Sequence, residues 1–171
     1  MLDIIRNAWK TVDIRKKILF TLFIIVIYRI GSVIPFPYID WASLQAGGAT
    51  NDFFSYLSIL TGGGLEYGAI FAMSVTPYIN ASIIIQLLTI VFPKLEELQK
   101  DGETGRKKIA EISRYLTIGL AVVESIALII GFGNSGILEG GLTFWNVVII
   151  TASFTAGSAF LMWLGERITE K

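Results

Sequence analysis

Few side chains in this sequence are suited to chemistry, and the most unusual of them is Glu124. The chain has no histidine and no cysteine, so it lacks the commonest general base, the commonest zinc ligands and any thiol nucleophile. Glu124 is a single acid inside an apolar run, whereas Glu96 and Glu97 fall in a charged, solvated stretch. A membrane protease needs a nucleophile with a base, paired acids or a metal set, and no GxSxG motif is present. We therefore expect no enzyme activity, no cofactor and no metal.

The amino-acid composition indicates the kind of protein that contains Glu124. Of the 171 residues, 53% are hydrophobic and 16% are charged, whereas ordinary soluble domains carry about 25% charged residues. The sequence is therefore that of a membrane protein. Its formal net charge is zero, which argues against a nucleic-acid partner, because phosphate binding needs clustered excess cations.

The longest apolar stretch is interrupted by Pro77. Residues 65–92 are almost entirely apolar and long enough to cross a bilayer, but a proline removes a backbone donor and clashes with the preceding turn. We expect a short glycine-led piece over 65–73 and a helix over 77–91. A broken helix at membrane depth indicates protein or a water-filled cavity beside it. A kink that serves only helix packing fits this stretch equally well.

The loop charges predict the topology. The N-terminus, the connection after Pro93 and the C-terminus together carry thirteen of the fourteen lysines and arginines, and Arg29 lies inside a span, near its far end. By the positive-inside rule this predicts both termini in the cytoplasm and four crossings. The expected parts are a cytoplasmic amphipathic arm (1–17), span 1 (18–34), the broken segment (62–92), a cytoplasmic loop (93–114), span 3 (115–132) and span 4 (142–164).

Several long motifs resemble one family. RIGSVIPFP, TGGG, IFAMSVTPYINASIIIQLLTIVFP, DGETGRKKIAEISRY and FLMWLGERITE occur in this order, and they are similar to the N-terminal part of the SecY family, the central subunits of bacterial protein-conducting channels. The resemblance covers the whole chain. It implies an all-α polytopic membrane bundle, of which this chain is the first four spans of a ten-span fold built from two inverted halves.

The resemblance also implies roles for the broken segment. Its short piece would be a plug in the outer funnel of the pore, and the helix after Pro77 would form one side of a lateral gate that opens toward lipid. The residues implied for the plug are Gly62, Gly63, Gly64, Leu65, Tyr67, Ile70, Phe71 and Ala72. Those implied for a hydrophobic pore ring are Val75 and Ile79. Those implied for the gate are Asn80, Ile83, Gln86, Leu87 and Glu124.

Glu124 departs from the neutral polar residue that the family tends to have at the matching place. A charged carboxylate in a span costs several kcal/mol, about 2.5–3.5 on insertion scales, unless it is paired, hydrated or protonated. We expect Glu124 to lie near Asn80 rather than to face lipid. A solvated acid in the pore and a neutral acid in the core are the alternatives.

The implied function is passage of unfolded secretory proteins across the bacterial cytoplasmic membrane, and release of membrane segments into it. The implied partners are SecE, SecG, the remaining half of SecY, signal sequences, nascent chains and membrane lipid. SecA, the motor ATPase, and the ribosome would dock mainly on loops of the other half. Half of a secondary transporter for a small solute is the alternative, because such proteins also use broken helices and intramembrane acids.

Overall fold

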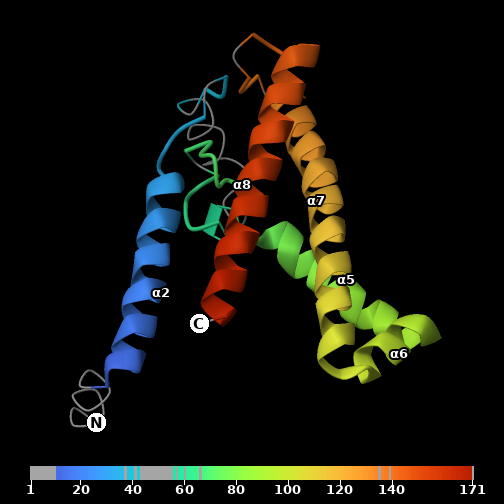
Figure 1. The fold of residues 1–171 in the computed structure, drawn as a ribbon. Helices are drawn as coiled ribbons and strands as arrows, with labels where there is room; N and C mark the ends of the chain where they lie inside the picture. Colours follow the sequence, from blue (N-terminus) through green and yellow to red (C-terminus); the bar gives the residue numbers. More distant parts are fainter. Residues whose placement is uncertain are drawn as a thin grey trace.

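The computed structural model describes residues 11–36, 38–40, 42, 56, 58–59, 61–65, 67–134, 136–138 and 140–170. Its helices follow in the order α2 (Val12–Gly31), α5 (Thr76–Val91), α6 (Pro93–Lys100), α7 (Gly102–Asn134) and α8 (Phe144–Glu170) (Figure 1). The described residues contain no β-strand, only isolated bridges between Pro35 and Ala69 and between Ile39 and Leu138. The expected all-α architecture is confirmed.

Two helices, α7 and α8, are long and apolar enough to cross a membrane. Helices α5 and α6 qualify together as a third candidate, bent by 103° where they meet. Helix α2 has 20 residues, but charged residues in its first turns and Arg29 near its end shorten the apolar stretch. The described residues thus contain two or three candidate spans, and the four crossings stay a prediction.

The connection after the broken segment is more regular than the expected loop over 93–114. Helix α6 begins at Pro93, and α7 begins at Gly102, well before the predicted start of its span. Ion pairs four residues apart, Lys100 with Glu96 at 2.6 Å and Lys107 with Glu103 at 3.1 Å, favour helix on a polar surface. The connecting Gly102 has φ of +70°, a conformation that glycine adopts without strain.

Other boundaries also differ from those expected. Helix α2 ends at Gly31, before the predicted end of span 1 at residue 34, and α8 continues to Glu170, beyond the predicted end of span 4 at residue 164. The expected arm over 1–17 lies outside the described residues as far as residue 10. From Val12 onward it belongs to α2 and is not a separate helix.

Helix α7 packs against α5, α6 and α8, and α8 packs also against α2 and α5. In Figure 1, α5 starts well below the upper ends of α7 and α8, and the chain that leads into it lies above it. The two connections predicted to lie outside meet at the upper end, where the amide of Asp40 donates to the carbonyl of Ile137 at 2.9 Å. The start of α2, the end of α8 and helix α6 lie at the opposite end.

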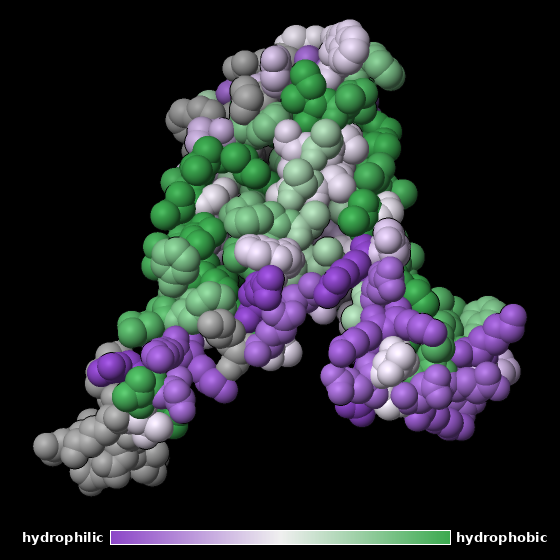
Figure 2. Space-filling view, viewed as in Figure 1, coloured by the Kyte–Doolittle hydropathy of each residue, from purple (hydrophilic) through white to green (hydrophobic). Residues whose placement is uncertain are grey.

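The best-packed core lies where α7 and α8 meet the chain that leads into α5. Phe132 and Ile129 of α7 and Phe154 and Ile150 of α8 are fully buried, in one cluster with Leu65 and Ala72. Elsewhere the helices expose large apolar side chains, which form the green flanks in Figure 2, while hydrophilic side chains gather at the end that holds α6 and the C-terminus. This distribution is typical of a membrane protein.

Candidate functional site

The site is built around an irregular stretch between α2 and α5, residues 61–75 with residue 66 not described, which we call the turned segment. It is a succession of turns, and Gly62, Gly63 and Gly68 take φ of +63°, +87° and +52°, which residues with a Cβ rarely adopt. Pro77 then lies in the first turn of α5, where its missing amide hydrogen removes no hydrogen bond within the helix. The predicted division at this proline is confirmed, with the helix starting at Thr76.

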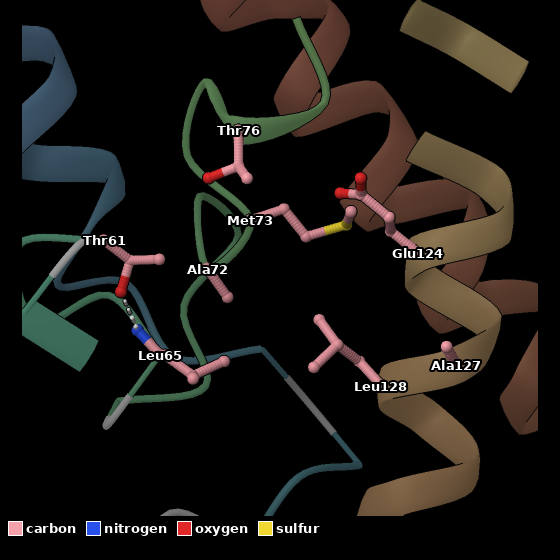
Figure 3. A pocket seen from close by; sticks show the side chains of 8 residues that line it. All are labelled: Thr61, Leu65, Ala72, Met73, Thr76, Glu124, Ala127 and Leu128. Atoms are coloured by element: carbon pink, nitrogen blue, oxygen red, sulfur yellow. Dashed lines mark hydrogen bonds between the residues drawn. The ribbon is translucent and has the colours of Figure 1, made fainter. Parts of the chain in front are cut away.

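A cavity of about 350 Å³ lies between part of the turned segment and α7. Figure 3 shows Met73 and Glu124 directed toward one another across it. Its lining is apolar apart from the Glu124 carboxylate and two threonines, and comprises Thr61, Leu65, Ala72, Met73, Thr76, Glu124, Ala127 and Leu128. The cavity is thus a small, largely apolar space with one acid at its wall.

Glu124 also joins α7 to the helix after the break. The amide nitrogen Nδ2 of Asn80 donates to Oε1 of Glu124 at 2.9 Å, so the expected contact between these two residues is confirmed. The pair therefore ties α5 to α7 beside the cavity that Glu124 lines.

Two serines that sequence reasoning missed hold the end of the turned segment. The hydroxyl of Ser125 on α7 lies 3.0 Å from Sδ of Met73 while it donates to the carbonyl of Ala121. The hydroxyl of Ser158 on α8 donates to the carbonyl of Ser74 at 3.4 Å. Both serines are buried. A serine inside an apolar helix indicates a polar contact, and this signal was available in the sequence. The partners of the two serines are a thioether and a backbone carbonyl, which the sequence does not identify.

The residues implied for the plug differ in how much of their surface is exposed. Leu65, Phe71 and Ala72 are buried, with 2%, 8% and 1% of their surface exposed, whereas Tyr67 is 42% exposed. Phe71 lies between Tyr28 and Phe160, with ring centroids 6.3 and 6.1 Å away. The others range from exposed to buried: Gly62 is exposed, Gly63 and Ile70 are half-buried, and Gly64 is buried.

The residues implied for the ring and gate lie on α5, except Val75, which directly precedes it, and Glu124, which lies on α7. The amide of Ile79 donates to the carbonyl of Val75 at 3.1 Å, so the helical repeat brings the two onto adjoining turns of one face. Val75 packs partly against the cluster around Ile24 and Phe71, while Ile79 is 49% exposed. Neither lines the cavity beside Glu124. The remaining gate residues, Ile83, Gln86 and Leu87, are exposed.

A second, more polar cavity of about 280 Å³ lies where α5, α6, α7 and the end of α8 meet. Gln86 lines it together with Arg106 and Glu166, and Glu166 accepts a hydrogen bond from Nε of Arg114 at 2.7 Å. The structure thus separates Gln86 from Glu124, which line different cavities. Within the part of the chain that the structure describes, no group of three or more acidic, histidine or cysteine residues is placed to hold a metal ion.

Comparison with known proteins gives a consistent result. The family model described as SecY matches residues 69–171. A protein translocase subunit SecY of Bacillus subtilis is 45% identical over 172 aligned positions, which cover 99% of this chain and 40% of the relative. Those of Streptomyces coelicolor and Mycobacterium tuberculosis are 40% and 38% identical, each covering all of this chain and 42% of the relative. The chain therefore spans about two-fifths of the length of these relatives.

Proposed function

The chain belongs to the SecY family, and from this we propose that it is the N-terminal part of a non-enzymatic, channel-forming subunit of a Sec translocon. The complete channel would pass unfolded secretory proteins across the bacterial cytoplasmic membrane and release membrane segments into it. The single structural observation that carries the proposal is the turned segment. It interrupts a membrane-length apolar stretch and fills the space between α2, α7 and α8 beside a cavity.

In this proposal the turned segment is the plug of the closed channel. An interior stopper must leave its place without unfolding the helices around it, and a succession of glycine turns can rearrange more easily than a helix. Val75, the last residue of the segment, and Ile79, on α5, would contribute to an apolar ring. A narrow ring of aliphatic side chains resists wetting and so blocks ions, yet it can part for a polypeptide.

Helix α5, with α7 beside it, would form one side of the lateral gate. The exposed apolar face of α5, which includes Ile83 and Leu87, would pair with the remaining half of SecY, and Asn80 with Glu124 would be the polar contact inside the gate. A signal sequence would enter where α5 separates from its neighbours. This assignment is supported by the hydrogen bond between Asn80 and Glu124.

The proposed partners are SecE and SecG within the membrane, and SecA and the ribosome on the cytoplasmic side, together with signal sequences and nascent chains. Both ends of this chain would be cytoplasmic, because the loop cations gather there. The alternative of half a secondary transporter also accounts for a broken helix and an intramembrane acid. Membership of the SecY family favours the channel.

Cross-linking to a chain in transit tests the proposal. A photo-reactive residue at Ala127, which lines the cavity, in a full-length channel carrying this N-terminal sequence, is expected to cross-link to an arrested secretory protein. The matched control is the adjacent Ile126, which lines the groove between α7 and α8 instead. Equal cross-linking at both positions, or none at Ala127, would contradict a pore beside the turned segment.

A further inference from the structure

Both ends of the turned segment meet at one hydroxyl group. Tyr28, on the last turns of α2, donates from its hydroxyl to the carbonyl of Thr61 at 2.9 Å. The same oxygen lies 3.3 Å from Oγ of Ser74. Since the tyrosine has one proton and gives it to Thr61, the hydroxyl of Ser74 donates to Tyr28 in this arrangement. One side chain of α2 therefore holds residues thirteen positions apart in the sequence (61 and 74).

The neighbours of Tyr28 on α2 strengthen this attachment. Nη1 of Arg29 donates to the carbonyl of Gly62 at 3.2 Å. The ring of Tyr28 stacks on Phe71 with an interplanar angle of 9°. Gly31 leaves room for Phe71, because a Cβ at this position would overlap that ring. The end of α2 thus contacts the start of the turned segment through polar groups and its end through both a hydroxyl and a ring.

The attachment matters because it joins both ends of the segment through one atom. Inside the segment, amides bond to carbonyls a few residues away, such as Ala69 to Gly64 and Ala72 to Ala69, both at 2.9 Å. Its middle is joined to the chain after α2, where the amide of Ile70 donates to the carbonyl of Ile34 at 3.3 Å. Ser74 has φ of +52°, a strained conformation for a residue with a Cβ that persists only when its surroundings impose it. Tyr28 and Ser158 supply those surroundings through the side chain and the carbonyl of Ser74.

We propose that the hydroxyl of Tyr28 is a clamp that holds the turned segment closed, so that this hydroxyl is a positioning group that sets how readily the segment leaves its place. The proposal rests on the proposed function only in that the segment is taken as the plug. Two neutral hydrogen bonds joining the ends of a loop restrict it as a cross-link does. Their loss removes the link between the two ends, while the stacked ring and the bonds from Arg29 and Ser158 stay in place.

Hydrogen exchange measured by mass spectrometry tests the clamp directly. In a full-length channel carrying this N-terminal sequence, Tyr28→Phe removes both hydrogen bonds and keeps the stacking on Phe71. We expect amide exchange over residues 61–74 to become about tenfold faster, with exchange in α7 and α8 unchanged. The matched control is Tyr67→Phe in the same segment, because Tyr67 is exposed and has no hydrogen bond to the described residues. In this control, the amides of residues 61–74 are expected to exchange at the same rate as in the parent.

Ser74→Ala provides a second, independent variant. It removes only one of the two bonds, so it is expected to accelerate exchange less than Tyr28→Phe, and the double variant is expected to match Tyr28→Phe, because the bond they share is lost only once. Unchanged exchange in Tyr28→Phe, acceleration that spreads through the whole bundle, or additive effects in the double variant would overturn the clamp.

Resting ion conductance of the same variants separates the clamp from the plug. Faster exchange with more frequent channel openings in Tyr28→Phe supports both assignments. Faster exchange with unchanged conductance upholds the clamp and contradicts the plug role of the segment.

Discussion

Glu124 is the acid that lines the cavity beside the turned segment. It accepts a hydrogen bond from Asn80. A glutamine offers one acceptor oxygen where the carboxylate offers two, so Glu124→Gln is expected to weaken the tie between α5 and α7. In a full-length channel this variant should export a reporter with a weakened signal sequence several-fold more efficiently than the parent. The control is Glu111→Gln, at an exposed position of the same helix. Equal export by the parent and Glu124→Gln would contradict a gate role for this contact.

At the same scale, the sequence predicted some contacts and not others. Two polar side chains in apolar helices, Asn80 and Glu124, have few other partners at that depth, and their pairing could be foreseen. The role of Tyr28 could not, because a tyrosine is common in apolar helices and its acceptor is the backbone carbonyl of Thr61, which every residue carries. The position of Arg29 near the far end of its span likewise did not predict its hydrogen bond to the carbonyl of Gly62.

At the scale of elements, the close packing of α8 on the turned segment depends on Gly157. A Cβ there would lie 2.5 Å from the carbonyl oxygen of Ile70, a backbone atom that cannot turn aside. Gly157→Ala is therefore expected to destabilise the folded protein by about 1–3 kcal/mol, which exceeds the gain of up to about 1 kcal/mol from replacing glycine by alanine in a helix. Thermal unfolding in detergent should show a lower Tm.

Gly165→Ala is the matched control for this variant. Gly165 lies on the same helix with nothing within 4 Å of an added Cβ, so its substitution is expected to leave Tm unchanged or to raise it. Equal effects of the two substitutions would mean that α8 does not pack tightly on the turned segment.

The elements also show where sequence patterns are informative. Pro77 fixed the start of α5 to within one residue, because proline is confined to the first turn of a helix. The helices in 93–114 were missed, since a stretch rich in lysine and glutamate is typical of both solvated loops and solvated helices. The side-chain pairs that stabilise these helices depend on a four-residue spacing, which the overall composition does not report.

For the whole molecule, topology is the property that the sequence predicts most directly. Cysteines introduced at Gln45 and Asn134 are expected to react with an impermeant thiol reagent added to intact cells, because the two outer connections carry no cation. The hydrogen bond between Asp40 and Ile137 supports a common side for these connections. A cysteine at Gln99, on α6, should react only after the cells are opened. Labelling at Gln45 and Asn134 only in broken cells would reverse the topology.

We propose that this chain supplies the seal of a protein-conducting pore, with a plug formed by residues 62–72 of the turned segment and a ring that includes Val75 and Ile79. Deleting residues 65–72 is expected to give brief leaks, because neighbouring glycine-rich backbone can partly refill the space. Replacing both ring residues should have a more persistent effect, because no neighbouring segment replaces an aliphatic constriction.

Single-channel conductance in planar bilayers tests this claim most directly. A full-length channel with Val75→Gly and Ile79→Gly is expected to pass ions persistently in its resting state, since a wider and less apolar ring allows wetting. The parent channel should stay closed under the same conditions. A double variant that is as tight to ions as the parent would show that Val75 and Ile79 only pack against their neighbours and do not form the seal.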